Sequence, residues 1–110
     1  MSDYNPDKWL MVKLTNKADE SHYRIFACWY GGYLDGDSWK MNSGVTKITE
    51  DEKEYHFEGS SGSVYHCNKS MYGVSGYGAG VLGNLIEKSK DTVAIEILPL
   101  ETNFMELHYE

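Results

Sequence analysis

The sequence predicts a single α+β domain over residues 1–110: a mainly antiparallel, curved β-sheet with one short helix packed on it, in the order βββββ-α-ββ. Three observations support this fold class. The length of 110 residues suits one domain of ordinary size. Short runs of β-prone residues, separated by turn-rich segments, fill the chain up to about residue 67. Only residues 81–90 carry apolar side chains at helical spacing.

The first two strands are expected at residues 9–14 and 22–30, joined by a polar loop at 15–21. In the second of these strands, residues 23, 25, 27 and 29 face one way and residues 24, 26, 28 and 30 face the other. Both sets are largely apolar. A strand that is apolar on both faces is typical of a central position in a sheet.

A third strand is expected over residues 39–48, with a bulge at Asn42-Ser43-Gly44. Residues 55–57 and 64–67 then predict a hairpin around the loop at 59–62. With that turn, Phe57 pairs with Val64 and His56 pairs with Tyr65. His56 and His66 are therefore expected on neighbouring rungs and opposite faces.

The end of the chain is expected to form a glycine-rich loop, a helix and a closing hairpin. The loop covers residues 69–80, and the helix of about 9–12 residues follows it. Residues 92–98 and 104–109 alternate in polarity, so they predict two further strands that pair with each other.

Composition disfavours several classes of function. The formal net charge is −7 and Arg24 is the only arginine, so the chain is not expected to bind polymeric nucleic acid. We expect a cytoplasmic protein, because the N-terminal residues lack a signal-peptide pattern and no apolar stretch approaches about 18 residues. The two cysteines, Cys28 and Cys67, lack metal-finger spacing and are expected to be buried thiols of the core.

Enzymatic chemistry is not expected, because the chain has no nucleophile elbow, no HExxH motif and no Cys-His signature. Cys67 follows His66, but consecutive strand residues face opposite ways. No four-ligand zinc site and no cofactor are expected.

The strongest binding signal is the glycine-rich loop before the helix. Residues 78–83 match GxGxxG, although a dinucleotide-binding fold would need a strand ending at the first glycine and a parallel strand after the helix. Glycine-rich backbone at a helix N-terminus can still bind a phosphate or carboxylate. In the predicted site tyrosines stack on a base, glycine amides bind phosphate, and Arg24 or Lys69 neutralises it. The expected ligand-binding residues are Arg24, Lys69, Tyr72, Gly76, Tyr77, Gly78 and Gly80.

Two of these features have structural alternatives. The glycines can serve only to let the loop turn and pack. Arg24 can pair with a carboxylate such as Glu96 or Glu106 across the sheet instead of binding an anion.

Acidic residues offer a second kind of surface. They can imitate phosphates toward a basic groove on another protein, or they can form a solvated turn that keeps the domain soluble. The expected partner-binding residues are Asp35, Asp37, Glu50, Asp51 and Glu52.

In its size, its acidity and its content of tyrosine and glycine, the chain resembles small phage-encoded counter-defence proteins. The resemblance is one of composition and carries no residue over. It implies either a protein that sequesters a nucleotide-derived immune signal in the host cytoplasm, or an acidic inhibitor of a defence nuclease of the anti-CRISPR type. We expect the first. A third expectation is a structural or accessory phage protein, and pairing of two chains through an edge strand fits a sheet of this size.

Overall fold

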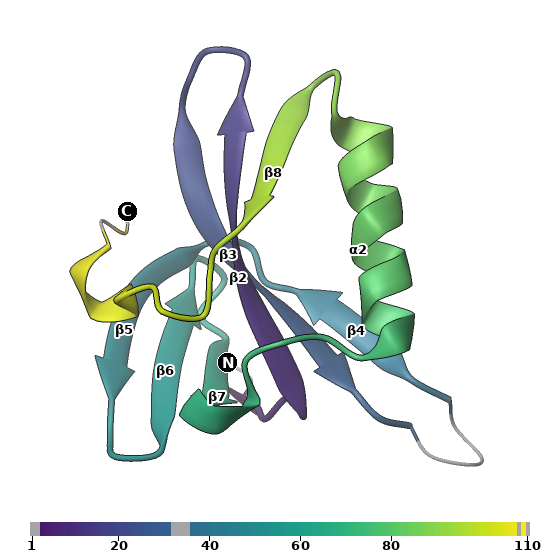
Figure 1. Ribbon diagram of the computed structural model, residues 1–110. Coiled ribbons are helices and arrows are strands. Elements are labelled where there is room, and N and C mark those ends of the chain that lie inside the picture. Colours follow the sequence, from purple (N-terminus) through teal and green to yellow (C-terminus); the bar gives the residue numbers. More distant parts are fainter. Residues whose placement is uncertain (1–2, 32–35, 108, 110) are drawn as a thin grey trace.

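Two four-stranded sheets and one helix stack as three layers in a computed structural model that describes residues 3–31, 36–107 and 109 (Figure 1). One sheet has the strand order β1-β7-β6-β5, the other has the order β4-β3-β2-β8, and neither is closed. The strands are β1 (Asp3–Tyr4), β2 (Lys8–Asn16), β3 (Ser21–Trp29), β4 (Ser38–Met41), β5 (Val45–Glu50), β6 (Glu54–Gly59), β7 (Val64–Asn68) and β8 (Val93–Ile97). The helices are α2 (Gly76–Ser89) and the 3₁₀ turns η1 (Lys69–Met71) and η2 (Phe104–Glu106). The predicted class, a mainly antiparallel β fold with one packed helix, is confirmed.

Strands β2 and β3 lie at the centre of the middle layer, the sheet β4-β3-β2-β8, and carry buried residues on both faces. Trp9, Met11, Ile25 and Ala27 face the other sheet and belong to one core cluster. The alternate residues, such as Phe26, face α2 and belong to a second cluster. The prediction that residues 22–30 form a central strand is therefore confirmed, because β3 lies between β2 and β4.

The expected single strand over residues 39–48 is wrong, because the chain changes sheets in the middle of it. β4 pairs with β3 in one sheet, whereas β5 pairs with β6 in the other. Asn42 fixes this corner: its backbone N–H donates to the Ile25 carbonyl, and its side-chain Oδ1 accepts from the Ile25 N–H at 2.9 Å. Gly44 follows with φ +130°, a left-handed conformation that favours glycine.

The hairpin of β6 and β7 is confirmed, but its register differs by one residue from the expectation. Phe57 pairs with Tyr65 and His56 pairs with His66. The loop is shorter than expected, because Gly59 N–H donates to the Ser63 carbonyl and Gly62 adopts φ +92°. His56 and His66 thus share one face of the sheet.

The helix begins earlier than predicted, at Gly76, so residues 69–80 are not a continuous loop. Ser75 caps the helix, and its side-chain oxygen accepts from the Gly78 N–H at 3.0 Å. Glycine has low helix propensity, which is why this first turn looks like a loop in the sequence.

The prediction of a closing hairpin of residues 92–98 and 104–109 is also wrong. β8 pairs with β2 and not with residues 104–109. The Asn103 side chain caps η2 instead, and Phe104 is buried in the core beside Trp9. One short parallel pair, β1 with β7, was not predicted.

Both cysteines are buried and free, as expected for core thiols. Burial raises the pKa of each thiol. Among the described residues, no helix has the length and apolar character needed to cross a bilayer.

Candidate functional site

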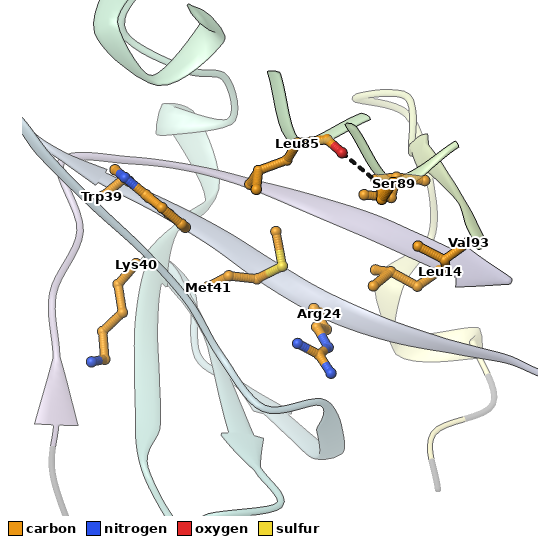
Figure 2. A pocket seen from close by; sticks show the side chains of 9 residues that line it. Leu14, Arg24, Trp39, Lys40, Met41, Leu85, Ser89 and Val93 are labelled. Atoms are coloured by element: carbon orange, nitrogen blue, oxygen red, sulfur yellow. Dashed lines mark hydrogen bonds between the residues drawn. The ribbon is translucent and has the colours of Figure 1, made fainter. Parts of the chain in front are cut away.

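A groove of about 520 Å³ lies between the second half of α2 and the sheet β4-β3-β2-β8 (Figure 2). Its floor and walls are mainly apolar side chains from β2, β4, β8 and α2. The lining residues are Leu14, Arg24, Trp39, Lys40, Met41, Leu85, Ser89, Val93 and Ile95. We call this surface the α2 groove.

Arg24 reaches the α2 groove because the edge strand β4 is short. β4 pairs with β3 only from Phe26 to Trp29, so it ends before Arg24. Phe26 and Arg24 lie two residues apart on β3 and therefore face the same layer. The arginine is half-buried beside Met41 at the open edge of the sheet.

The neighbour of Arg24 is a neutral histidine. Arg24 Nε donates to His22 Nε2 at 2.9 Å. Burial and, second, the positive charge of Arg24 lower the pKa of His22, so its ring carries no charge at neutral pH. Among the described residues, no carboxylate forms an ion pair with Arg24, so the expected pairing with Glu96 or Glu106 is not formed.

Arg24 is the cation of the α2 groove that belongs to the same face of β3 as Phe26. Lys40 also lines it, but its ammonium lies 5.2 Å from the ring centroid of Tyr4, which belongs to the opposite core. In Figure 2 the Lys40 side chain and the Arg24 guanidinium both point away from Leu85, so both charges lie at the rim of the groove. None of the lining residues is acidic, in a chain of net charge −7. The groove is thus an apolar surface with one charged edge.

The other predicted ligand-binding residues do not join Arg24. Tyr72 lies against Trp9 with ring centroids 4.7 Å apart, and its hydroxyl donates to the Leu98 carbonyl at 2.6 Å. Lys69 Nζ bonds Glu50 Oε1 at 2.6 Å and lies 4.9 Å from the Tyr55 ring centroid. Tyr72 therefore contributes to the core, and Lys69, in η1, forms an ion pair with Glu50 of the other sheet.

Gly76, Tyr77, Gly78 and Gly80 all belong to the first turns of α2. Gly78 is buried, and a Cβ at this position would lie 2.4 Å from Cys28 Sγ, so the glycine allows close packing of the helix on β3. Tyr77 is 47% exposed and has room for a partner. Along the helix, Gly80 precedes Leu85, the first α2 residue that lines the groove, by five residues, or roughly 8 Å at 1.5 Å per residue.

The acidic residues also lie on different sheets. Asp35 lies outside the described residues. Asp37 precedes β4 and accepts from the Gly31 N–H at 3.3 Å. Asp51 and Glu52 are exposed in the turn after β5, and Glu50 is paired with Lys69. Backbone N–H groups of Lys53 and Glu54 donate to Asp51 and lower the pKa of its carboxyl, so Asp51 stabilises this turn.

The predicted ligand-binding residues did not include the remaining residues that line the groove. Two patterns mark them: Leu85 and Ser89 are four residues apart on the helix, and Trp39 and Met41 alternate on β4. These patterns identify the faces, but they do not show that the two faces enclose a groove.

No protein-family model, no curated protein sequence and no solved structure matches the chain.

Proposed function

We propose that this protein is a non-enzymatic binding protein that sequesters a small anionic, nucleotide-derived ligand in the α2 groove. The observation that carries this proposal is the position of Arg24 at the edge of an apolar groove with a neutral histidine, and no carboxylate, as its partner.

Arg24 suits the anionic end of such a ligand. Its hydrogen bond to His22 uses Nε, and among the described residues Nη1 and Nη2 have no hydrogen-bond partner. Two terminal nitrogens in a fixed plane can donate in parallel to two oxygens of a phosphate. The bond to His22 also holds the guanidinium in one orientation, which lowers the entropic cost of binding.

Trp39 suits the ring of the ligand. Its indole stacks on Phe26, with ring centroids 5.5 Å apart and planes 18° apart, and it remains 38% exposed. Trp39 pairs with Cys28, four residues from Arg24 along β3, which is about 13 Å at strand spacing. A ligand that reaches both ends must be elongated, with its anionic group well separated from its ring.

The volume of the α2 groove, about 520 Å³, lies within the range of about 300–1,000 Å³ that is usual for small-molecule sites. The acidic surface elsewhere disfavours a long polyanion, so a compact nucleotide fits better than a nucleic acid strand. The compositional resemblance to phage counter-defence proteins makes signalling nucleotides the first compounds to test.

The test is a thermal-shift screen of the wild-type protein against AMP, cyclic nucleotides and ADP-ribose. A ligand at 100 times its Kd adds about 2.7 kcal/mol to the free energy of unfolding, which raises the Tm by several degrees. Arg24→Gln should remove most of this shift, whereas Lys47→Gln, an exposed lysine on β5, should keep it. Equal shifts in both variants would contradict the role of Arg24.

Decanoate serves as a second probe, because it combines an anion with an apolar chain but has no ring. A Tm shift with decanoate and none with any nucleotide would contradict a nucleotide ligand but would support ligand binding in the α2 groove. The mass recorded by light scattering in the same samples tests the expected pairing of two chains.

A second candidate function is an acidic inhibitor of a nucleic-acid-binding protein. The observation that favours it is the fixed, exposed carboxylate of Asp51 beside exposed Glu52 in one turn. If Asp51→Lys with Glu52→Lys abolishes capture of a nuclease while Arg24→Gln does not, this function replaces the first.

A further inference from the structure

The outer face of the β6–β7 hairpin carries a cluster that the α2 groove does not include. His56 and His66 are directly opposite each other, and their ring centroids lie 5.0 Å apart. Glu54 lies two residues before His56 and therefore on the same face. One ligand atom from each of these three side chains lies within 4.8 Å of the other two.

The ring of His56 is oriented by its neighbours. Its Nδ1 lies 3.4 Å from Thr49 Oγ1, on the neighbouring strand β5. Its Nε2 lies 3.4 Å from Glu54 Oε1 and 3.6 Å from Asp51 Oδ2. With Nε2 free to bind a metal, the Thr49 hydroxyl at Nδ1 resembles the outer-shell hydrogen bond that metal-binding histidines make through their other ring nitrogen.

His66 completes the cluster from the other strand. Its Nε2 lies 3.7 Å from Asp3 Oδ1, which β1 places beside β7. The side chains of His56, His66 and Glu54 are 24%, 28% and 33% exposed, so they are partly shielded and still accessible to an ion from solvent. Three carboxylates surround two imidazoles, and this excess of negative charge attracts a cation.

From this geometry we propose that His56, His66 and Glu54 bind one Zn²⁺ ion, with Asp3 and Asp51 as outer carboxylates. Two imidazoles and a carboxylate are a ligand set that zinc accepts, with a fourth position left for water. Ligands about 2.0–2.1 Å from a tetrahedral ion are roughly 3.3 Å apart, close to the 3.4 Å between Glu54 Oε1 and His56 Nε2. Small side-chain rotations bring His66 to the same spacing.

Imidazole ligands also determine which ion is favoured. Calcium and magnesium prefer sites made of oxygen atoms alone, whereas zinc accepts nitrogen readily. A cluster that acted only through its negative charge would bind calcium as well as zinc. Selective binding of zinc over calcium would therefore indicate a coordination site, whereas equal binding of both ions would indicate a diffuse acidic patch.

The experiment is isothermal titration of the full chain, first treated with a chelator, with zinc chloride. One ion should bind per chain, and calcium chloride should give no comparable heat. His66→Gln and Glu54→Gln should each weaken zinc binding by about tenfold or more. Glu58→Gln is the matched control, because this exposed carboxylate lies on the same face of β6, two residues beyond His56, and it should keep the wild-type affinity.

Circular dichroism and the Tm without zinc should be unchanged in all three variants, because their side chains lie on the outer face of the sheet. Absence of zinc binding by the wild-type protein would overturn the proposal, and so would an unchanged affinity in His66→Gln. Equal losses of zinc affinity in Glu54→Gln and Glu58→Gln would also overturn it, because they would mean that the negative charge of this face attracts the ion without coordination. A histidine NMR spectrum gives an independent measurement: zinc should shift the imidazole signals of His56 and His66.

Discussion

The two faces of the sheet β4-β3-β2-β8 are covered in different ways. On one face a second sheet closes over Trp9, which contacts Tyr55, Phe57, Tyr72 and Phe104 at ring distances between 4.7 and 6.0 Å. On the other face α2 alone covers the sheet, and the α2 groove stays open beside it. The first face is a sealed core, whereas the second combines a core with an open groove.

Simple dimensions explain this difference. Four strands about 4.8 Å apart make a sheet roughly 14–19 Å wide, whereas a helix with its side chains is about 10–12 Å across. One helix therefore cannot cover four strands. Leu82 is buried at the centre of the contact, and Leu85 is only partly buried where the α2 groove begins. The groove follows from having one helix where a wider layer would be needed to seal the sheet.

The largest expected effect compares an aromatic residue of the sealed face with an apolar residue of the open face. Trp9→Ala should lower the free energy of unfolding by about 3–5 kcal/mol, because it leaves a cavity among four aromatic rings. Leu85→Ala should cost only about 1 kcal/mol, because part of the lost surface already contacts solvent. Urea unfolding of both variants measures the difference. Equal losses of unfolding free energy in the two variants would mean that the two faces are packed alike.

A smaller effect compares two glycines of α2. Gly78→Ala should destabilise the fold by about 1–3 kcal/mol, because the new Cβ would meet Cys28 Sγ at 2.4 Å. Gly83→Ala should stabilise it by about 0.5–1 kcal/mol, since a Cβ there meets nothing within 4 Å and alanine favours the helix. Thermal unfolding of the two variants should shift in opposite directions. A stabilised Gly78→Ala variant would contradict the close contact between α2 and β3.

The smallest expected effect is a pH dependence of stability that arises on the sealed face. Burial and, second, the neighbouring Tyr4 and Cys67 raise the pKa of Tyr65 to about 12, against about 10 in the unfolded chain. Between these values the folded state retains a proton that the unfolded state loses, so stability is full below about pH 10 and falls as the pH rises toward 12. Urea midpoints from pH 8 upward should show this decline.

Tyr65→Phe is the control for the alkaline decline, because it removes the titrating hydroxyl from the same buried position. The decline should become shallower in this variant. Tyr109, whose pKa burial also raises, accounts for part of what remains. An unchanged slope would show that Tyr65 titrates normally.

Part of the fold could be predicted because the hydrophobic pattern determines it. The two apolar faces of residues 22–30 indicate a central strand, and the glycine-serine loop indicates the hairpin. The pattern also argues against the expected register: Tyr55, Phe57, Tyr65 and Cys67 share the buried face, whereas pairing of Phe57 with Val64 would place Tyr65 and Cys67 on the opposite face. Turn length alone gave a register shifted by one residue.

Other features depend on contacts between distant residues. The change of sheet at Asn42 rests on its bonds to Ile25, which no local pattern reveals. For the site, the rarity of arginine drew attention to Arg24, which lines the α2 groove. The GxGxxG match drew attention to the first turns of α2, where Gly78 allows close packing against Cys28.

The central claim is that the open face of the sheet binds a small anion through Arg24. The most direct measurement is an amide chemical-shift map of the isotope-labelled protein titrated with ADP-ribose and with AMP. We predict shifts at Arg24, Met41, Leu85 and Ser89, and none at Lys69–Met71. Shifts confined to Lys69–Met71 and the first turn of α2, or no shifts with either compound, would contradict the account.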